Sequence, residues 1–201
     1  MLSADGSLSK PLSGLKGTHV SGGSAIWILG DLEYALSKGF RPLGLEPVAV
    51  GVTADADHII TPSKDGPQRA MRQALEKSKI APEAIGSWDL HATATPGDFQ
   101  ELENLQTIIP KGVAVTARKG TFGHGMGVGG GWELTAQYLG YERGMLFPTP
   151  LRPEEVHDSI QKLGQNLVFD RPVEFPQRPV GKLSMGVGGI NACVISKPWE
   201  K

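Results

Sequence analysis

A glycine-rich run near the middle of the chain sets a strong limit on its fold. In the segment GHGMGVGGGWE, the glycines at 127, 129, 130 and 131 lead directly into Trp132. Each glycine inside a helix costs about 1 kcal/mol relative to alanine, so a helix built on this run needs compensating contacts. Because glycine has no Cβ atom, neighbouring backbone can approach it closely. We therefore expect a helix buried between two layers; the alternative is a glycine loop before a helix that begins at Trp132.

Apolar strand patterns alternate with helical patterns along the chain, which is typical of an α/β fold. Strands are expected at the end of residues 17–29 and over residues 47–53, 88–91, 113–117, 166–169, 182–187 and 190–196, the last two as a hairpin around 186–189. Helices are expected over residues 31–39, 65–80 and 98–107 and from about residue 124. The helix over 65–80 has one face of apolar or small residues, formed by Ala70, Met71, Ala74, Leu75 and Ser78. No linker divides the chain.

Composition excludes several classes of function. The 201 residues include 20 basic and 21 acidic side chains, which gives a net charge of −1 without any Lys/Arg run. A track for nucleic acid or an anionic membrane surface is therefore not expected. No apolar stretch approaches membrane-spanning length, and the beginning of the sequence lacks the basic and apolar regions of a signal peptide. We expect a cytoplasmic protein that binds small molecules or another protein.

Two histidines, His91 and His124, are the strongest candidates for a functional site. Each lies where an apolar strand is expected to end and is followed by small residues. Side chains at such positions can converge on one pocket and stabilise negative charge on a substrate. A third metal ligand is not evident nearby, so we expect no metal site. We expect no cofactor either, although Gly125-x-Gly127-x-x-Gly130 formally matches a dinucleotide fingerprint.

Three motifs follow one another along the chain. The first is HATATPGDFQE, and the last is GVGGINACVIS. Between them lies the run K-x-x-x-G-H-x-x-G-x-x-G-x-x-E, which is formed by Lys119, Gly123, His124, Gly127, Gly130 and Glu133. In this order they resemble the first-histidine motif, the lysine and second-histidine motif, and the closing segment of the β-ketoacyl-acyl carrier protein synthase family. The similarity extends over essentially the whole chain.

The resemblance implies a thiolase-like α/β fold, of which this chain would be the C-terminal half, a mixed sheet with a buried glycine-rich helix. Residues 1–45 would be a remnant of the N-terminal half, its last strand and helix, and residues 46–201 would form the C-terminal ketoacyl synthase domain. In the family, the nucleophilic cysteine lies in the N-terminal half. The chain alone is therefore expected to be inactive and to need a missing N-terminal half or a full-length ketosynthase partner, as a homo- or hetero-oligomer.

The resemblance also implies a role for each site residue. His91 and His124 would hold the malonyl thioester carbonyl as its enolate develops, and Lys119, paired with Glu101, would order the site. The backbone N–H of Val187 would contribute to an oxyanion hole. Supporting positions are Thr93, Thr95, Asp98, Gly188 and Asn191, with Asn191 interpreted as a structural tie. The substrates would be acyl carrier protein thioesters of fatty acid or polyketide synthesis.

This sequence departs from the family pattern at several positions. The motif after His91 is one residue shorter than usual, which could shift Glu101 relative to Lys119, and Val187 replaces the usual phenylalanine. The single cysteine, Cys193, lies in an apolar strand pattern, so we interpret it as a small buried hydrophobe rather than a nucleophile. Two other functions remain open. One is a non-catalytic, chain-length-factor-type subunit, and the other is a nucleotide-binding α/β domain.

Overall fold

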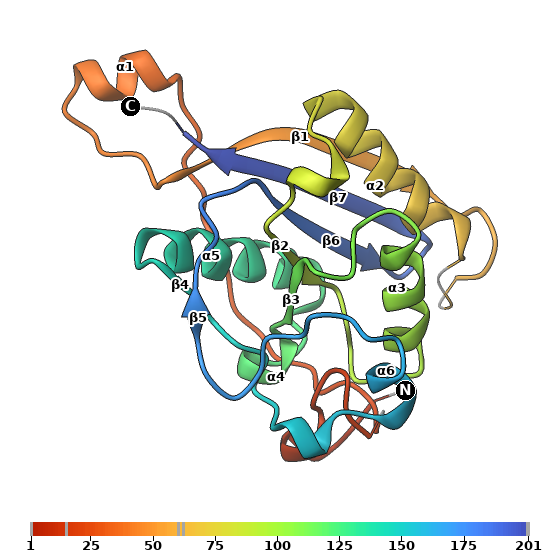
Figure 1. The fold of residues 1–201 in the computed structure, drawn as a ribbon. Helices are drawn as coiled ribbons and strands as arrows, with labels where there is room; N and C mark the ends of the chain where they lie inside the picture. Colours follow the sequence, from red (N-terminus) through yellow and green to blue (C-terminus); the bar gives the residue numbers. More distant parts are fainter. Residues whose placement is uncertain (1, 15, 60, 62, 200–201) are drawn as a thin grey trace.

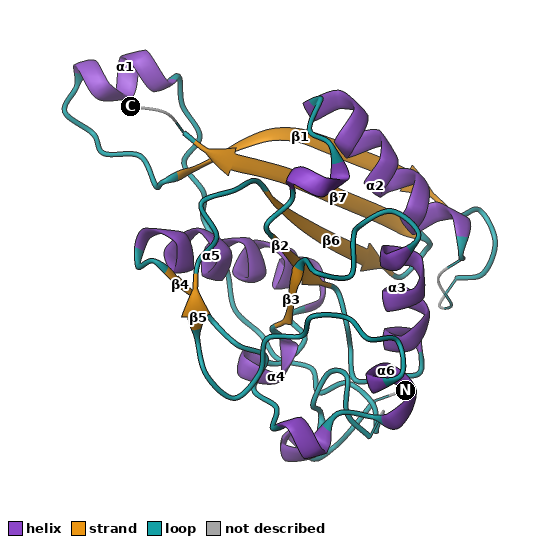
Figure 2. Ribbon diagram, in the orientation of Figure 1, coloured by secondary structure: helices purple, strands orange, loops and turns teal. Residues whose placement is uncertain are grey.

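A five-stranded mixed sheet forms the centre of the molecule (Figures 1 and 2). The computed structural model describes residues 2–14, 16–59, 61 and 63–199. The sheet order is β1-β7-β6-β2-β3, with β1 (Leu45–Ala54), β2 (Ser87–Leu90), β3 (Ala114–Ala117), β6 (Val180–Gly186) and β7 (Ile190–Pro198). β2 runs parallel to β3 and β6, and the β6–β7 hairpin and β1 complete the sheet with antiparallel pairing. The predicted hairpin around residues 186–189 is confirmed.

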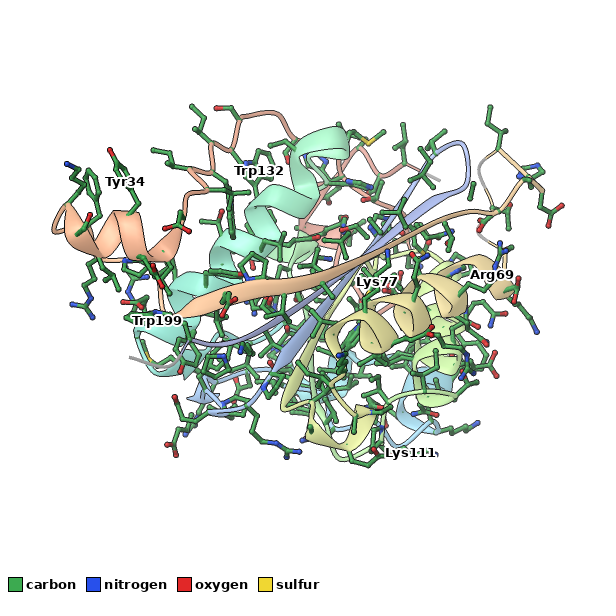
Figure 3. All side chains as sticks on the ribbon, turned by 90° about the horizontal axis from the view of Figure 1, so that it is seen from above. Tyr34, Arg69, Lys77, Lys111, Trp132 and Trp199 are labelled. Atoms are coloured by element: carbon green, nitrogen blue, oxygen red, sulfur yellow. The ribbon has the colours of Figure 1, made fainter. Side chains whose placement is uncertain are left out.

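Helices cover the two faces of this sheet. The predicted helices over 65–80 and 98–107 form as α2 (Asp65–Ser78) and α3 (Gly97–Gln106), and they pack on one face together with α6 (Asp158–Gln161). α5 (Gly129–Glu142) lies on the opposite face, as the view from above makes clear (Figure 3). The predicted apolar side of α2 is buried at Ala70, Met71, Ala74 and Leu75. The fold is thus α/β, as the alternating pattern predicted, and its sheet is mixed, as the resemblance implied.

The glycine-rich run divides between a loop and the start of α5. Helix α5 begins at Gly129, between the two predicted starts, so three glycines occupy its first turn, where the helical penalty is small. A Cβ atom on Gly130 would lie 3.0 Å from the Ser184 hydroxyl of β6, and one on Gly131 would lie 3.1 Å from the Ala25 side chain. The helix therefore lies between the sheet and the segment around Ala25, which explains the need for glycine.

The predicted strand at residues 22–29 is not formed. This segment is extended and lies along α5, where the Trp27 indole donates to Thr135 Oγ1 at 3.0 Å and the Trp132 indole donates to Ser24 O at 3.0 Å. Its other side faces solvent, with Ile26 88% and Ile28 94% exposed. A strand requires a neighbouring backbone to pair with, and none of the described residues provides one.

A short helix projects from the body after this extended segment. The predicted helix over 31–39 forms as α1 (Leu32–Ser37), with the Asp31 carboxylate accepting from the Tyr34 N–H at 2.8 Å and Gly39 at φ 76° after its end. Tyr34 points away from the rest of the molecule (Figure 3). The side chains that α1 exposes are largely apolar, which leaves this arm without a core of its own.

Several smaller elements complete the fold. The predicted strand at 166–169 is absent; Leu167 and Phe169 form only isolated bridges with Val115 and Thr149. A two-stranded pair that the pattern did not predict joins β4 (Met145–Leu146) and β5 (Val173–Glu174). The remaining elements are α4 (Lys119–Phe122) and the 3-10 turns Gly6–Leu8, Pro82–Ala84, Met126–Val128 and Pro153–Glu155. Within the described ranges, no helix is both long and apolar enough to cross a membrane.

Side chains of α2 cover the outer edge of the sheet along β1. The Gln73 amide oxygen accepts from the Val52 N–H at 2.7 Å. Lys77 donates to Val50 O at 3.1 Å, and Arg69 donates to Ala54 O at 3.0 Å; both side chains lie along this edge in Figure 3. These contacts satisfy backbone groups that an edge strand normally leaves open.

Candidate functional site

The structure brings His91 and His124 together. His91 follows the last residue of β2, and His124 follows α4, with His124 N–H donating to His19 O at 2.7 Å. The centroids of the two imidazole rings lie 5.4 Å apart, with the ring planes at 79°. The end of a strand and the glycine turn after a short helix thus place both rings at one point of the molecule.

Hydrogen bonds fix the same tautomer in both histidines. The Met126 backbone N–H donates to His124 Nδ1 at 3.1 Å. Lys119 Nζ lies 3.2 Å from His91 Nδ1, and an ammonium group can only donate there. In both rings Nδ1 is therefore the acceptor, and Nε2 carries the proton. Each imidazole has one N–H left to donate to a ligand.

The surroundings of the two rings keep them neutral. Burial lowers the pKa of His91 well below its ordinary value, and the nearby Lys119 charge adds to this effect. Burial, again assisted by Lys119, lowers the pKa of His124 to about 4. Near neutral pH the pair consequently acts as two uncharged hydrogen-bond donors rather than as imidazolium acids.

Lys119 is the cation beside the histidines, and its partner differs from the predicted one. The expected ion pair with Glu101 is wrong, because Lys119 Nζ lies 2.6 Å from Glu133 Oε1 of α5 and also donates to His91 O. Both side chains of this pair are almost completely buried. Burial lowers the pKa of Lys119, and the Glu133 carboxylate opposes that shift. Glu133 was part of the family motif, but the spacing of that motif gave no sign that Glu133, rather than Glu101, would be the partner of Lys119.

Glu101 supports the loop that carries His91. Its two carboxylate oxygens accept from the backbone N–H groups of His91 at 2.7 Å and Ala92 at 2.8 Å. Burial raises the pKa of this carboxyl to about 7, against the opposing effect of the His91 N–H. Glu101 thus holds the backbone that ends β2 and does not bind Lys119 directly.

Asp98 holds the rest of the same loop. Its carboxylate accepts from the N–H groups of Thr93 at 2.8 Å and Ala94 at 3.1 Å, and from Leu12 in the N-terminal segment at 2.9 Å. The hydroxyls of Thr93 and Thr95 lie 3.0 Å apart. Burial raises the pKa of Asp98, while these N–H donors favour its ionised form. The predicted supporting residues therefore form the frame of the His91 loop.

The turn between β6 and β7 carries the remaining predicted residues. Val187 is 65% exposed, and the Gly188 N–H donates to Ile59 O at 2.7 Å. The buried Asn191 amide donates to the Asp55 carboxylate at 2.6 Å, a contact that fits the expected structural tie. Burial in the sheet raises the pKa of the Cys193 thiol, as expected of a cysteine that packs as a small hydrophobe.

A cavity of about 220 Å³ opens at the histidine pair. Its lining combines the polar site with residues of the 3-10 turn Met126–Val128, the first turn of α5 and the β6–β7 hairpin, namely His91, Lys119, His124, Met126, Gly127, Gly129, Gly130, Ser184, Met185, Gly186, Ile190 and Ala192. Val187 does not line it. In the part of the chain that the structure describes, no three His, Cys, Asp or Glu side chains gather as a metal site would require.

The sequence analysis missed three buried charged residues behind the site. Lys182 of β6 lies 2.7 Å from Glu133 Oε2, and Arg118 Nε lies 3.2 Å from Asp89 Oδ1 of β2. Each of the three side chains is less than 5% exposed. The signal in the sequence was a charged residue inside an apolar strand pattern, at Asp89 in SWDL and Lys182 in VGKLSM.

The glycine-rich segment does not have the arrangement of a dinucleotide fingerprint. Such a fingerprint requires a strand that leads directly into the first glycine. Here α4 and a turn lie between the end of β3 at Ala117 and Gly125. The nucleotide-binding interpretation therefore loses its structural basis.

The fold and the paired histidines define the C-terminal domain of a ketosynthase. The family model for the beta-ketoacyl synthase C-terminal domain matches residues 46–151, and the chain belongs to the β-ketoacyl synthase family. The 3-oxoacyl-[acyl-carrier-protein] synthase 1 of Escherichia coli (strain K12) is 30% identical over 183 residues, and that of Haemophilus influenzae is 28% identical over 186 residues. These matches cover 90% and 92% of this chain.

Solved structures agree with the sequence comparison. The structure described as "The ishigamide ketosynthase/chain length factor" superposes with a TM-score of 0.89 at 28% identity, covering 99% of this chain and 48% of that one. The present chain spans 43% of the Escherichia coli relative and 44% of the Haemophilus influenzae relative. It therefore corresponds to somewhat less than half of each of these proteins.

Proposed function

We propose that this chain supplies the carbonyl-holding half of a ketosynthase that condenses malonyl and acyl thioesters of an acyl carrier protein with loss of CO₂. The observation that carries the proposal is the tautomer of the two histidines: His91 and His124 both accept at Nδ1 and keep a proton on Nε2. Two neutral donors beside one cavity suit a thioester oxygen that gains negative charge.

In the proposed reaction the two histidines act while the malonyl group loses CO₂. The electrons of the broken C–C bond form an enolate, whose oxygen accepts hydrogen bonds from the Nε2–H groups of His91 and His124. The enolate carbon then attacks the carbonyl carbon of the acyl thioester on a cysteine of the other half. The new C–C bond forms as the bond to the cysteine sulfur breaks, and the cysteine leaves as a thiolate. Lys119 holds the His91 ring and adds positive charge without giving up a proton. The names of the relatives, which include acyl carrier protein, support this substrate class.

The nucleophile must come from a part that this chain does not contain. Cys193 is fully buried in β7 and is not among the residues that line the cavity at the histidines. The sheet face beside the cavity is partly bare: Val50, Val52 and Ile190 are 45%, 56% and 56% exposed. An apolar surface next to an incomplete site supports a partner that covers both. We propose that this partner is the cysteine-bearing half or a full-length ketosynthase.

The same proposal assigns residues 1–45 to the N-terminal half of the complete fold. The extended segment at 22–29 would be its last strand, and α1 its last helix. The segment at 22–29 forms no strand pairing with any described residue, which supports the assignment. The beginning of the chain is nevertheless tied to the site: Gly17 N–H donates to Ala94 O at 2.7 Å and Leu12 N–H to Asp98.

A non-catalytic, chain-length-factor-type subunit is the second candidate. The similarity to a structure described as a ketosynthase/chain length factor favours it. A subunit that only shapes the pocket of a partner would have no use for two oriented N–H donors and a buried lysine. The retained His91, His124 and Lys119 therefore favour the catalytic proposal.

Release of labelled CO₂ from malonyl-acyl carrier protein tests the proposal. We expect no turnover by this chain alone and turnover when it is co-expressed with a cysteine-bearing N-terminal ketosynthase half. His124→Ala should abolish the turnover of the co-expressed complex. His157 is an exposed histidine, and His157→Ala should leave that turnover unchanged. Turnover by the isolated chain, or full turnover by the His124→Ala complex, would contradict the proposal.

A further inference from the structure

Lys182 is a buried cation that the proposed mechanism does not use. It lies on β6 with a side chain only 1% exposed. Its Nζ lies 2.7 Å from Glu133 Oε2 and donates to Leu90 O at 3.2 Å, next to His91 in the chain. Removing an ammonium group from water is costly, and hydrophobic side chains of similar volume are often at least as stabilising. Stability alone therefore does not explain a lysine at this position, and we expect a second role.

Lys182 is the middle member of a row of alternating charges. The row begins with Arg118, whose Nε lies 3.2 Å from Asp89 Oδ1. Asp89 Oδ2 lies 3.9 Å from Lys182 Nζ. Glu133 follows, with one oxygen facing Lys182 and the other 2.6 Å from Lys119. Three cations and two anions give the row an excess positive charge, and Lys119 is its end at the cavity.

We infer that Lys182 is a positioning residue, which holds one oxygen of Glu133 so that the other keeps Lys119 against His91. A carboxylate with a single cationic partner can turn both oxygens toward it. Without Lys182, Glu133 would therefore bind Lys119 more closely and draw its Nζ away from His91 Nδ1. The inference rests on the proposed function for its catalytic meaning, while the contacts themselves belong to this chain alone.

The first test measures the histidines directly and needs no activity. Nitrogen-detected NMR of the imidazole rings gives the tautomer and the pKa of His91 and His124. The charged groups that face these rings are Lys119, Lys182 and Glu133. Lys182→Met removes a positive charge, so we expect both pKa values to rise by about one pH unit or more. We also expect His91 Nδ1 to lose its fixed acceptor role.

Two variants serve as controls. Lys182→Arg keeps the charge and should retain the wild-type tautomers and pKa values. Lys197→Met makes the same charge change at a lysine whose side chain is 45% exposed and should have no effect on the two rings. If Lys182→Met does not fold, Lys182→Gln removes the same charge while its side-chain amide can still donate to a neighbouring oxygen. A folded Lys182→Met protein in which both rings titrate as in the wild type would overturn the inference.

A second test uses the complex reconstituted with the cysteine-bearing half. Lys182→Met should lower kcat about 100-fold, the loss expected when a reacting group is misplaced by about 1 Å, and leave KM within about threefold. Lys182→Arg should restore most of kcat. An equal loss in both variants would overturn the positioning role. If the wild-type complex itself shows no condensation, the proposed function fails, whereas the NMR result still decides the role of Lys182.

Discussion

Glu133 Oε1 lies 2.6 Å from Lys119 Nζ, with both side chains almost completely excluded from solvent. The pair joins α5 to α4 and thereby fixes the distance between the glycine-rich helix and the histidine that follows α4. Breaking a buried ion pair on one side leaves an uncompensated charge. The stability of the fold and the order of the site therefore depend on the same contact.

Replacement of Glu133 should lower stability strongly. We expect Glu133→Ala to reduce the free energy of unfolding by about 3–5 kcal/mol, because Lys119 and Lys182 would remain buried without their shared anion. Urea denaturation followed by circular dichroism measures the change. The exposed pair of Arg69 and Asp65 on α2 provides the control, and Asp65→Ala should change stability by less than about 1 kcal/mol. Equal effects of the two replacements would contradict the expected difference.

Glycine is required where β1 crosses α2. A Cβ atom on Gly51 would lie 2.1 Å from Ala70 O and 2.9 Å from Ala74 N, and both are backbone atoms that cannot turn aside. We expect Gly51→Ala to destabilise the protein by about 3 kcal/mol or more. Gly112→Ala is the matched control, since nothing lies within 4 Å of its added methyl group. The midpoints of thermal unfolding compare the two, and a Gly51→Ala protein as stable as the control would refute the expected clash.

The histidine pair should make stability depend on pH. The folded-state pKa of His124 is lowered from 6.5 to about 4, so the unfolded chain binds more protons in this range. Its contribution to stability is present above pH 6.5 and is lost as the pH falls from 6.5 toward 4. Glu101 acts in the opposite sense, because its folded-state pKa is raised from 4.5 to about 7. The stability that Glu101 contributes is therefore present below pH 4.5 and is lost as the pH rises to 7.

Two variants separate these opposing contributions. Urea unfolding between pH 4 and pH 7 should show a smaller loss of stability on acidification for His124→Gln than for the wild type. Glu101→Gln should show the reverse, with a larger loss on acidification, since it removes the group that is stabilising at low pH. Parallel profiles for all three proteins would show that neither group titrates as the structure requires.

Cys193 should not react in the folded protein. Its thiol is buried in β7, and burial raises its pKa, so almost no thiolate forms near neutral pH. We expect a disulfide-exchange reagent to label it only as fast as the protein unfolds, and labelling in urea to be complete within minutes. Rapid labelling without denaturant would indicate an accessible thiolate and would reopen a nucleophilic role for this residue.

The exposed side of the extended segment should govern association. Ile26 and Ile28 are 88% and 94% exposed, so the double variant Ile26→Asp/Ile28→Asp should leave the free energy of unfolding within about 0.5 kcal/mol of the wild type. Sedimentation should show at least about tenfold weaker self-association or partner binding. Val173→Asp, at another partly exposed apolar position, should have no effect on association. A wild-type chain that stays monomeric at all concentrations and binds no ketosynthase half would contradict this prediction.

The sequence predicted the elements whose signals are local and missed those that depend on distant partners. The apolar face of α2, the N-cap at Asp31 and the hairpin around residues 186–189 follow from spacing and turn residues within a few positions. The segment at 22–29 has the composition of a strand but no partner backbone, so its pattern could not decide its structure.

The same division applies to the candidate site. The two histidines were candidates because each lies beyond the expected end of an apolar strand, and Lys119 joined them through the resemblance of its motif to the β-ketoacyl synthase family. The partner of Lys119 could not be derived, because Glu101 and Glu133 are both acidic and lie on different helices. Only the packing of α5 on β6, through Gly130 and Ser184, brings Glu133 to the lysine. Lys182 went unnoticed because a charge in an apolar strand has no assigned meaning until its partners are known.

The three α2 side chains along the outer edge of β1 have a consequence for how copies of this chain can associate. Gln73, Lys77 and Arg69 occupy backbone groups to which a foreign strand would otherwise add. Addition of a foreign strand is therefore opposed at this edge of the central sheet, whereas apolar side chains such as Ile26, Phe40 and Val52 stay exposed elsewhere in the described part of the chain. Contacts between copies of this chain are thereby directed away from strand-by-strand addition at β1 and toward packing of side chains.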